Sequence, residues 1–194
     1  MALFGCFGVV MKIYGFNNEL NKKKLAFNFC EHVVLNNNFN LIFLCVGNSN
    51  VVADLFGPMC GSLLKQKNKN LNVFGTLENN VTSKNLEKIF NKIKQEYVNP
   101  LIIVIDSALG QVEEVGQLKF FEHGCLPAHK TNNIVMGNLS FLGVVNTIGI
   151  SDFLILKSVK FNNVCLLSEF CVNSILEGLK LIEIYKNSSN KISV

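Results

Sequence analysis

Charge and proline are scarce in this sequence of 194 residues, of which 16% are charged, 49% are hydrophobic and three are proline. Disordered chains combine low hydrophobicity with high charge, so this composition excludes that class. No proline-rich linker and no internal repeat divides the chain, and its length fits one domain. We therefore expect a single domain over residues 1–194, with 1–16 as a candidate N-terminal tail and 186–194 as a flexible C-terminal tail.

Long hydrophobic runs are also missing, because no uninterrupted apolar stretch reaches the roughly 20 residues that a membrane helix needs. The apolar start, residues 1–10, has no basic residue before it, and Lys12 follows it instead. A secretory signal has the opposite order. We expect residues 1–10 to form a buried strand or a docked tail, with a removable leader as the alternative. The predicted location is cytoplasmic, with no membrane partner.

Paired cysteines are absent too. The seven cysteines, at positions 6, 30, 45, 60, 125, 165 and 171, form no Cys-x-x-Cys motif, and several lie inside apolar runs. They are typical of buried thiols in a reducing compartment and support neither a zinc site nor a disulfide framework. The sequence also lacks a P-loop, a dinucleotide fingerprint and a Gly-x-Ser-x-Gly elbow, so no cofactor is expected. The net charge of +4 comes from scattered lysines, and we expect no nucleic-acid partner.

What is present is an alternation of short apolar runs with amphipathic segments. The runs predict strands at 41–46, 71–74, 101–105, 115–121 and 140–145. The amphipathic segments predict helices at 18–35, 58–67, 82–97 and 163–185. Strands that alternate with helices form a mostly parallel sheet covered on both faces. The fold class is therefore α/β in three layers, with one antiparallel partner among the last strands.

Two aspartates stand where ligands bind in open α/β sheets, outside the carboxyl ends of strands near the point where strand order reverses. Asp106 directly follows strand 101–105, and Asp54 lies between strand 41–46 and the helix behind Pro58. If these strands are neighbours, both carboxylates meet at one edge of the sheet. Two carboxylates in a water-restricted cleft share a proton, one acting as base and the other as acid, as in aspartic-type hydrolysis.

Each aspartate also has a purely structural alternative. Asp54 could cap the helix that follows it, since aspartate is a preferred N-cap residue. Asp106 could end its strand through an Asx-turn with Ser107. No metal is expected, although His129, in a predicted loop, could complete a metal site with the two aspartates.

Four blocks of the sequence resemble the YyaC family of sporulation proteins from endospore-forming bacteria. They are VGNSNVVADLFGP at 46–58, VFGTLE at 73–78, IVIDSALG at 103–110 and GVVNTIG at 143–149. The order and spacing of the blocks make the match specific. This family is similar in turn to the germination protease of spores and to hydrogenase maturation endopeptidases, which implies a phosphorylase/hydrolase-like α/β/α fold.

The resemblance implies a sporulation-associated peptidase-like hydrolase with Asp54 and Asp106 as its catalytic pair. It implies substrate-binding residues at Gly47, Asn48, Ser49 and Asn146. The expected partner is a protein or peptide substrate, such as a spore protein, in the cytoplasm of the developing spore or the mother cell. Ser49 and Asn50 stand where family members carry an acidic-basic pair. A catalytically inactive peptide-binding protein of the same fold is therefore the alternative.

Overall fold

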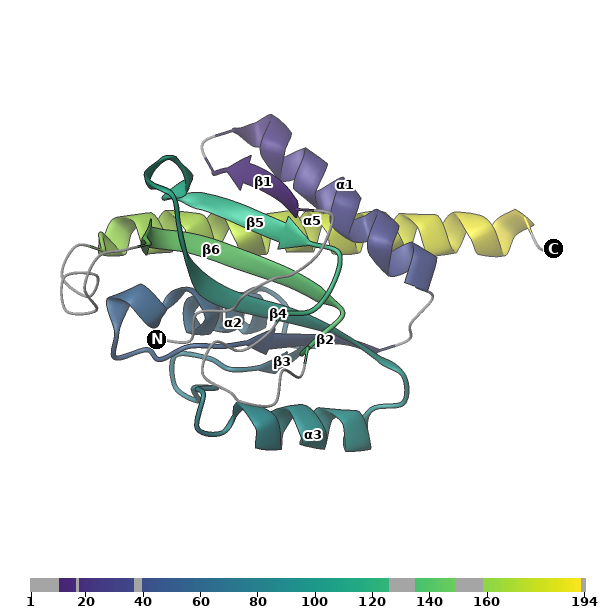
Figure 1. Cartoon of the computed structure of the whole chain (residues 1–194). Coiled ribbons are helices and arrows are strands. Elements are labelled where there is room, and N and C mark those ends of the chain that lie inside the picture. The colour runs from purple at the N-terminus through teal and green to yellow at the C-terminus, as the bar shows by residue number, and fades with distance from the viewer. Residues whose placement is uncertain (1–10, 17, 37–39, 126–134, 149–158, 193–194) are drawn as a thin grey trace.

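A mixed sheet of six strands lies at the centre of the computed structural model, which describes residues 11–16, 18–36, 40–125, 135–148 and 159–192 (Figure 1). The strands are β1 (Met11–Gly15), β2 (Asn40–Cys45), β3 (Asn72–Phe74), β4 (Pro100–Gly110), β5 (Gln117–Phe121) and β6 (Leu139–Thr147). Their order is β1-β5-β6-β4-β2-β3. The pairs β2/β3, β2/β4 and β4/β6 are parallel, whereas β5 is antiparallel to both β1 and β6.

Helices cover both faces of this sheet. The described α-helices are α1 (Glu19–Asn36), α2 (Phe56–Lys67), α3 (Leu86–Glu96) and α5 (Phe161–Ile192). Two short 3-10 helices, η1 (Val52–Asp54) and η2 (Val112–Glu114), interrupt the connections. Helices α1, α2 and α5 pack on one face, and α3 packs on the other (Figure 1). The predicted three-layer, mostly parallel α/β fold with one antiparallel partner for the strand at 140–145 is confirmed.

The residues of β4 divide between two cores because successive side chains of a strand point to opposite faces. Ile103 and Ile105 belong to the core that contains α1, α2 and α5. Ile102 and Val104 belong to the core that contains α3. A strand buried on both faces has an uninterrupted apolar run, which is why the sequence pattern located β4.

The chain reverses its direction of travel across the sheet between β2 and β4. From β2 it passes through α2 to β3 on one side, and from β3 it returns through α3 to β4 on the other side of β2. Because α2 and α3 lie on opposite faces, this position is a topological switch point, the place where ligands bind in open α/β sheets.

Most element boundaries differ from the sequence-based prediction by a few residues, and three differences change the description of the fold. Strand β4 continues to Gly110, five residues beyond the predicted end, because it keeps pairing with β6. Helix α5 extends to Ile192 and therefore enters the segment predicted as a C-terminal tail. Residues 11–15, within the predicted N-terminal tail, form β1.

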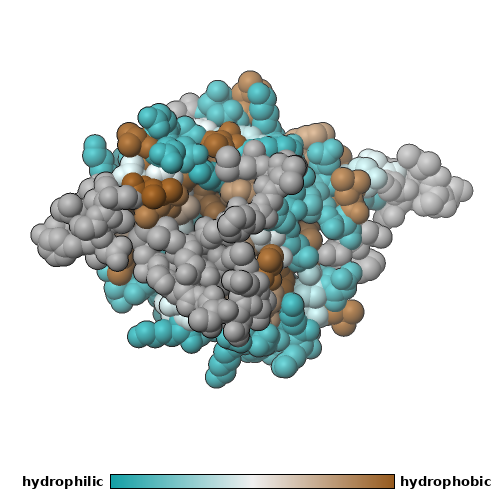
Figure 2. All heavy atoms as spheres, viewed as in Figure 1, coloured by the Kyte–Doolittle hydropathy of each residue, from teal (hydrophilic) through white to brown (hydrophobic). Residues whose placement is uncertain are grey.

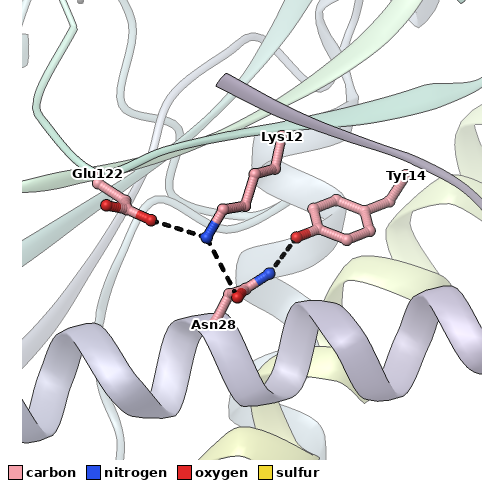
Figure 3. A network of polar contacts seen from close by, with 4 residues as sticks. All are labelled: Lys12, Tyr14, Asn28 and Glu122. Atoms are coloured by element: carbon pink, nitrogen blue, oxygen red, sulfur yellow. Dashed lines mark hydrogen bonds and ion pairs between the residues drawn. The ribbon is translucent and has the colours of Figure 1, made fainter. Parts of the chain in front are cut away.

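A polar network attaches β1 to α1 and to the end of β5 (Figure 3). Lys12 Nζ lies 3.0 Å from Glu122 Oε1 and donates a hydrogen bond of 3.2 Å to Asn28 Oδ1. Asn28 Nδ2 in turn donates to the hydroxyl of Tyr14. Burial raises the pKa of that hydroxyl above its ordinary value. Within the described parts of the chain, no helix combines the length and apolarity needed to cross a membrane.

Candidate active site

The loop after β2 is folded back on itself by backbone hydrogen bonds. The Asn48 N–H donates to the backbone oxygen of Asp54 (3.0 Å), and the Asp54 N–H donates to Val51 O (2.8 Å). Gly47 has φ of 145°, and a Cβ at this position would lie 2.1 Å from the backbone oxygen of Asp54. Only glycine fits this close approach, so Gly47 allows the loop to bring the backbone of Asp54 to this position.

Asp54 lies in η1 with 8% of its surface exposed. The N-cap residue of α2 is Leu55, and no side chain caps that helix end. The N-cap alternative for Asp54 is therefore wrong. Its Oδ1 atom is buried and has no hydrogen-bond partner within the described residues.

Asp106 lies inside β4, opposite Leu142 of β6, and is completely buried. The prediction that it follows the end of its strand is wrong, and so is the Asx-turn alternative, because β4 continues for four residues beyond it. The backbone N–H of Ser107 donates to Asp106 Oδ1 (2.7 Å). Asp106 Oδ2 is buried without a hydrogen-bond partner among the residues described.

The two carboxyl groups influence each other electrostatically. Burial raises the pKa of Asp106 well above its ordinary value, and the negative charge of Asp54 raises this pKa further. Burial also raises the pKa of Asp54, while a hydrogen bond from the Asn48 backbone acts in the opposite direction. The structure thus places both predicted aspartates at the switch point between β2 and β4. Burial therefore favours the protonated form more strongly at Asp106 than at Asp54.

A small cavity opens beside Asp54. It has a volume of about 190 Å³ and is lined by Val46, Gly47, Asn48, Asp54, Thr82, Ser83 and Lys84. Of the six predicted site residues, Gly47, Asn48 and Asp54 line this cavity. Asp106 does not line it. Asp106 follows Ile105 in β4, and the backbone oxygen of Ile105 accepts the N–H of Val46 (2.8 Å), one of the residues that line the cavity.

A pair of reciprocal hydrogen bonds joins the loop after β2 to the segment before α3, close in sequence to residues that line this cavity. The Ser49 N–H donates to Asn80 Oδ1 (2.5 Å), and Asn80 Nδ2 donates to Ser49 Oγ (3.0 Å). Asn85 Nδ2 donates to the backbone oxygen of Asn80 (3.0 Å), and the Gly47 N–H donates to Val81 O (2.8 Å). Ser49 therefore fixes the loop after β2 to the segment that leads into α3. Sequence reasoning missed Asn80, because Asn79-Asn80 has the composition of an ordinary turn.

Asn146 is not among the residues that line this cavity. It pairs with Leu109 near the end of β6, four residues beyond Leu142, the neighbour of Asp106. That separation from Leu142 corresponds to about 13 Å along the strand. Asn146 Oδ1 accepts the N–H of Thr147 (2.9 Å).

The described residues contain no group of three histidine, cysteine or acidic side chains placed to hold a metal ion. His129, the histidine considered as a ligand, lies outside the described residues. The charged side chains at the cavity are Asp54 and Lys84. This arrangement can exchange a proton with a bound molecule at Asp54 and can attract a polar or negatively charged group to Lys84.

Comparisons with known proteins cover most of the chain. The family model described as "Protein of unknown function (DUF1256)" matches residues 14–174, a range that includes both aspartates. The chain is also similar to the uncharacterized protein YyaC of Bacillus subtilis (strain 168), with 28% identity over 146 residues. This match covers 74% of the chain and 69% of YyaC. The chain therefore belongs to this family of proteins of unknown function, and its predicted relationship to YyaC is confirmed.

Proposed function

We propose that this chain hydrolyses a peptide bond in a protein substrate, with Asp54 and Asp106 acting as one carboxyl pair. The observation that carries the proposal is that two buried carboxyl groups at a switch point each keep an oxygen without a partner among the described residues. Structural aspartates normally satisfy their buried oxygens, because an unsatisfied one costs stability. Buried acidic groups with raised pKa values are therefore candidates for function.

The two aspartates have unequal roles in this proposal. Asp54 lies at the cavity wall, so its carboxylate accepts a proton from the attacking water while the water oxygen bonds to the peptide carbonyl carbon. The carbon–nitrogen bond then breaks, and the amine leaves with the proton that Asp54 accepted. Asp106 holds the shared proton and exchanges it with Asp54, which asparagine at this position could not do, so the pair carries one negative charge and Asp54 is the ionised group at the cavity.

Cleavage can be tested without knowing the natural substrate. A library of peptides derived from a bacterial proteome is incubated with the protein, and new termini are identified by mass spectrometry. Wild-type protein is expected to produce defined cleavages. Asp54→Asn is expected to lower the rate by about 10²–10⁴-fold, the usual contribution of a general base, and Asp106→Asn is expected to lower it strongly.

Glu31→Gln is the matched control. Glu31 is an exposed carboxylate on α1, which packs on the face of the sheet opposite α3, and its replacement is expected to leave cleavage unchanged. Cleavage that persists in Asp54→Asn at the wild-type rate and at the same bonds would refute the proposal. So would equal loss in all three variants, since the loss would then not depend on the pair.

A peptide-binding protein that does not cut is the second candidate, and one observation favours it. The cavity reaches Asp54 but not Asp106, so only one carboxyl group can touch a ligand there. A binder is indicated if wild-type protein retains peptides from the same library and leaves every one of them intact.

The sporulation setting of the proposal rests on the resemblance to the YyaC family. It predicts that the substrate is a spore protein met in the cytoplasm of the developing spore or the mother cell. Cleavages enriched in peptides from spore proteins, relative to the rest of the library, would support this setting.

A further inference from the structure

Three lysines follow one another at intervals of four residues along α3 and the turn before it. They are Lys84, Lys88 and Lys92, and all three are exposed. Positions four apart lie on the same side of a helix. The turn continues into α3 in helical register, since the Leu86 N–H donates to Thr82 O (2.9 Å). The three ammonium groups therefore belong to one row, which we call the lysine row.

The lysine row begins at the cavity of the candidate active site, because Lys84 lines that cavity together with Asp54. Neither Lys84 nor Lys88 forms an ion pair with another described residue, and Lys92 pairs weakly with Glu96 at 3.6 Å. Hydrophilic residues project along the lower edge of the molecule in Figure 2, on the side where α3 lies in Figure 1. A row of cations without strong partners, ending at a pocket, can select a ligand by charge.

We propose that the lysine row docks an acidic segment of the substrate polypeptide and leads it into the cavity beside Asp54. This inference rests on the proposed function, whose substrate class it narrows to proteins with an acidic stretch next to the reacting bond. From Lys84 to Lys92 the helix rises about 12 Å, which an extended peptide spans in about four residues. Acidic side chains at alternate positions of such a peptide would face the row.

A polypeptide fits these observations better than a nucleic acid. Glu87 and Glu96 interrupt the positive charge of α3, so the row is narrow, whereas nucleic acids bind broad basic surfaces. The aromatic residue of α3, Phe90, is buried and offers no platform on which a base could stack. The cavity of about 190 Å³ also suits one small group of a peptide.

Binding is tested by fluorescence anisotropy with a labelled Glu-rich peptide, in the Asp106→Asn background so that the peptide is not consumed. The same peptide with every Glu replaced by Gln is the reference ligand. Reversing the row with Lys84→Glu, Lys88→Glu and Lys92→Glu is expected to weaken binding of the acidic peptide about tenfold or more. Added salt is expected to weaken binding in the parent protein as well.

The matched control reverses three exposed lysines outside this row, Lys23→Glu, Lys24→Glu and Lys69→Glu, and is expected to keep most of the affinity. Equal binding of the Gln peptide, equal loss in the control, or tighter binding of a single-stranded oligonucleotide would each overturn the inference. Acidic-peptide binding without any cleavage by wild-type protein would remove the hydrolase proposal and leave the docking surface standing. Cleavage without preference for acidic peptides would remove the docking surface and leave the hydrolase proposal standing.

Discussion

Replacing Asp106 by asparagine is expected to stabilise the protein at neutral and alkaline pH, although it removes a proposed functional group. The carboxyl group of Asp106 is completely buried, and its pKa is raised by burial and by the charge of Asp54. Asparagine is nearly the same size, and its Oδ1 can still accept the N–H of Ser107. The substitution therefore removes an ionisable group and little else.

The sign of the effect follows from proton binding. Between the ordinary pKa of 3.8 and the higher pKa of the folded state, the folded chain holds a proton that the unfolded chain has released. The wild-type free energy of unfolding therefore falls as pH rises through this window, by up to about 1.4 kcal/mol per pH unit for one group. For a chain of this size that slope corresponds to about 3–5 °C in Tm per pH unit. Below the ordinary pKa, both states are protonated and the contribution is fully present.

The assay is urea or thermal unfolding of wild type and Asp106→Asn at a series of pH values from acidic to mildly alkaline. The difference in unfolding free energy is expected to be near zero at the acidic end and to grow in favour of the variant as pH rises. Glu114→Gln is an informative control, because a hydrogen bond from Lys119 lowers the pKa of Glu114. Glu114 contributes stability that is present above its ordinary pKa and lost in acid, so its removal is expected to give a pH dependence of opposite sign.

An Asp106→Asn variant less stable than wild type at pH 8 would refute this reasoning. So would a stability difference that does not change with pH. Either result would mean that the folded protein holds an ionised Asp106 with a compensating partner. The proposal that Asp54 and Asp106 share one proton would then lose its support.

Three further substitutions test a close backbone contact after β2, the hydrogen bonds between Ser49 and Asn80, and the polar network at β1. Gly57→Ala is expected to lower the unfolding free energy by about 1–3 kcal/mol, because its Cβ would lie 2.0 Å from a backbone oxygen at the end of β2. Gly15→Ala, whose Cβ would meet its nearest atom at 3.9 Å, is expected to have little effect, and equal losses would contradict the packing argument. Asn80→Ala is expected to reduce kcat of any cleavage while costing about 1–2 kcal/mol of stability, and Asn79→Ala, in the same turn, serves as its control. Tyr14→Phe is expected to cost about 1 kcal/mol in urea unfolding, and no loss would show that the network around β1 contributes nothing.

The centre of the sheet could be predicted from the sequence, because a strand buried on both faces leaves an unbroken apolar run. The runs at 41–46 and 101–105 located β2 and the first half of β4. The second half of β4 was missed because Asp106 and Ser107 break the apolar run. Strand pairing depends on backbone groups, which the side-chain pattern does not report, and these groups keep β4 paired with β6 to Gly110.

That Asp54 and Asp106 lie near one switch point could be predicted from the sequence, because a mostly parallel sheet was expected and β2 and β4 are parallel neighbours in it. Asn80 and Lys84 could not be predicted in this way. They belong to the connection between β3 and α3, and only the folded chain places that connection across the cavity from the loop after β2. Composition alone marks Asn80 as a turn residue and Lys84 as a surface charge.

The position of Asp106 inside a strand, rather than after one, strengthens the case that its burial serves a function. An aspartate at the end of a strand can turn its side chain toward water and relieve the cost of burial. Asp106 cannot, because β4 stays paired with β6 both before and after it along the chain. The alternation of side chains along the strand points the Asp106 side chain to the same face as Val104 and Ala108, which belong to the core that contains α3. The chain thus holds a carboxyl group where asparagine or an apolar residue would give a more stable protein. Functional groups are often kept at a cost in stability. We therefore expect the stability gained by Asp106→Asn and the activity lost in the same variant to be two measures of one feature.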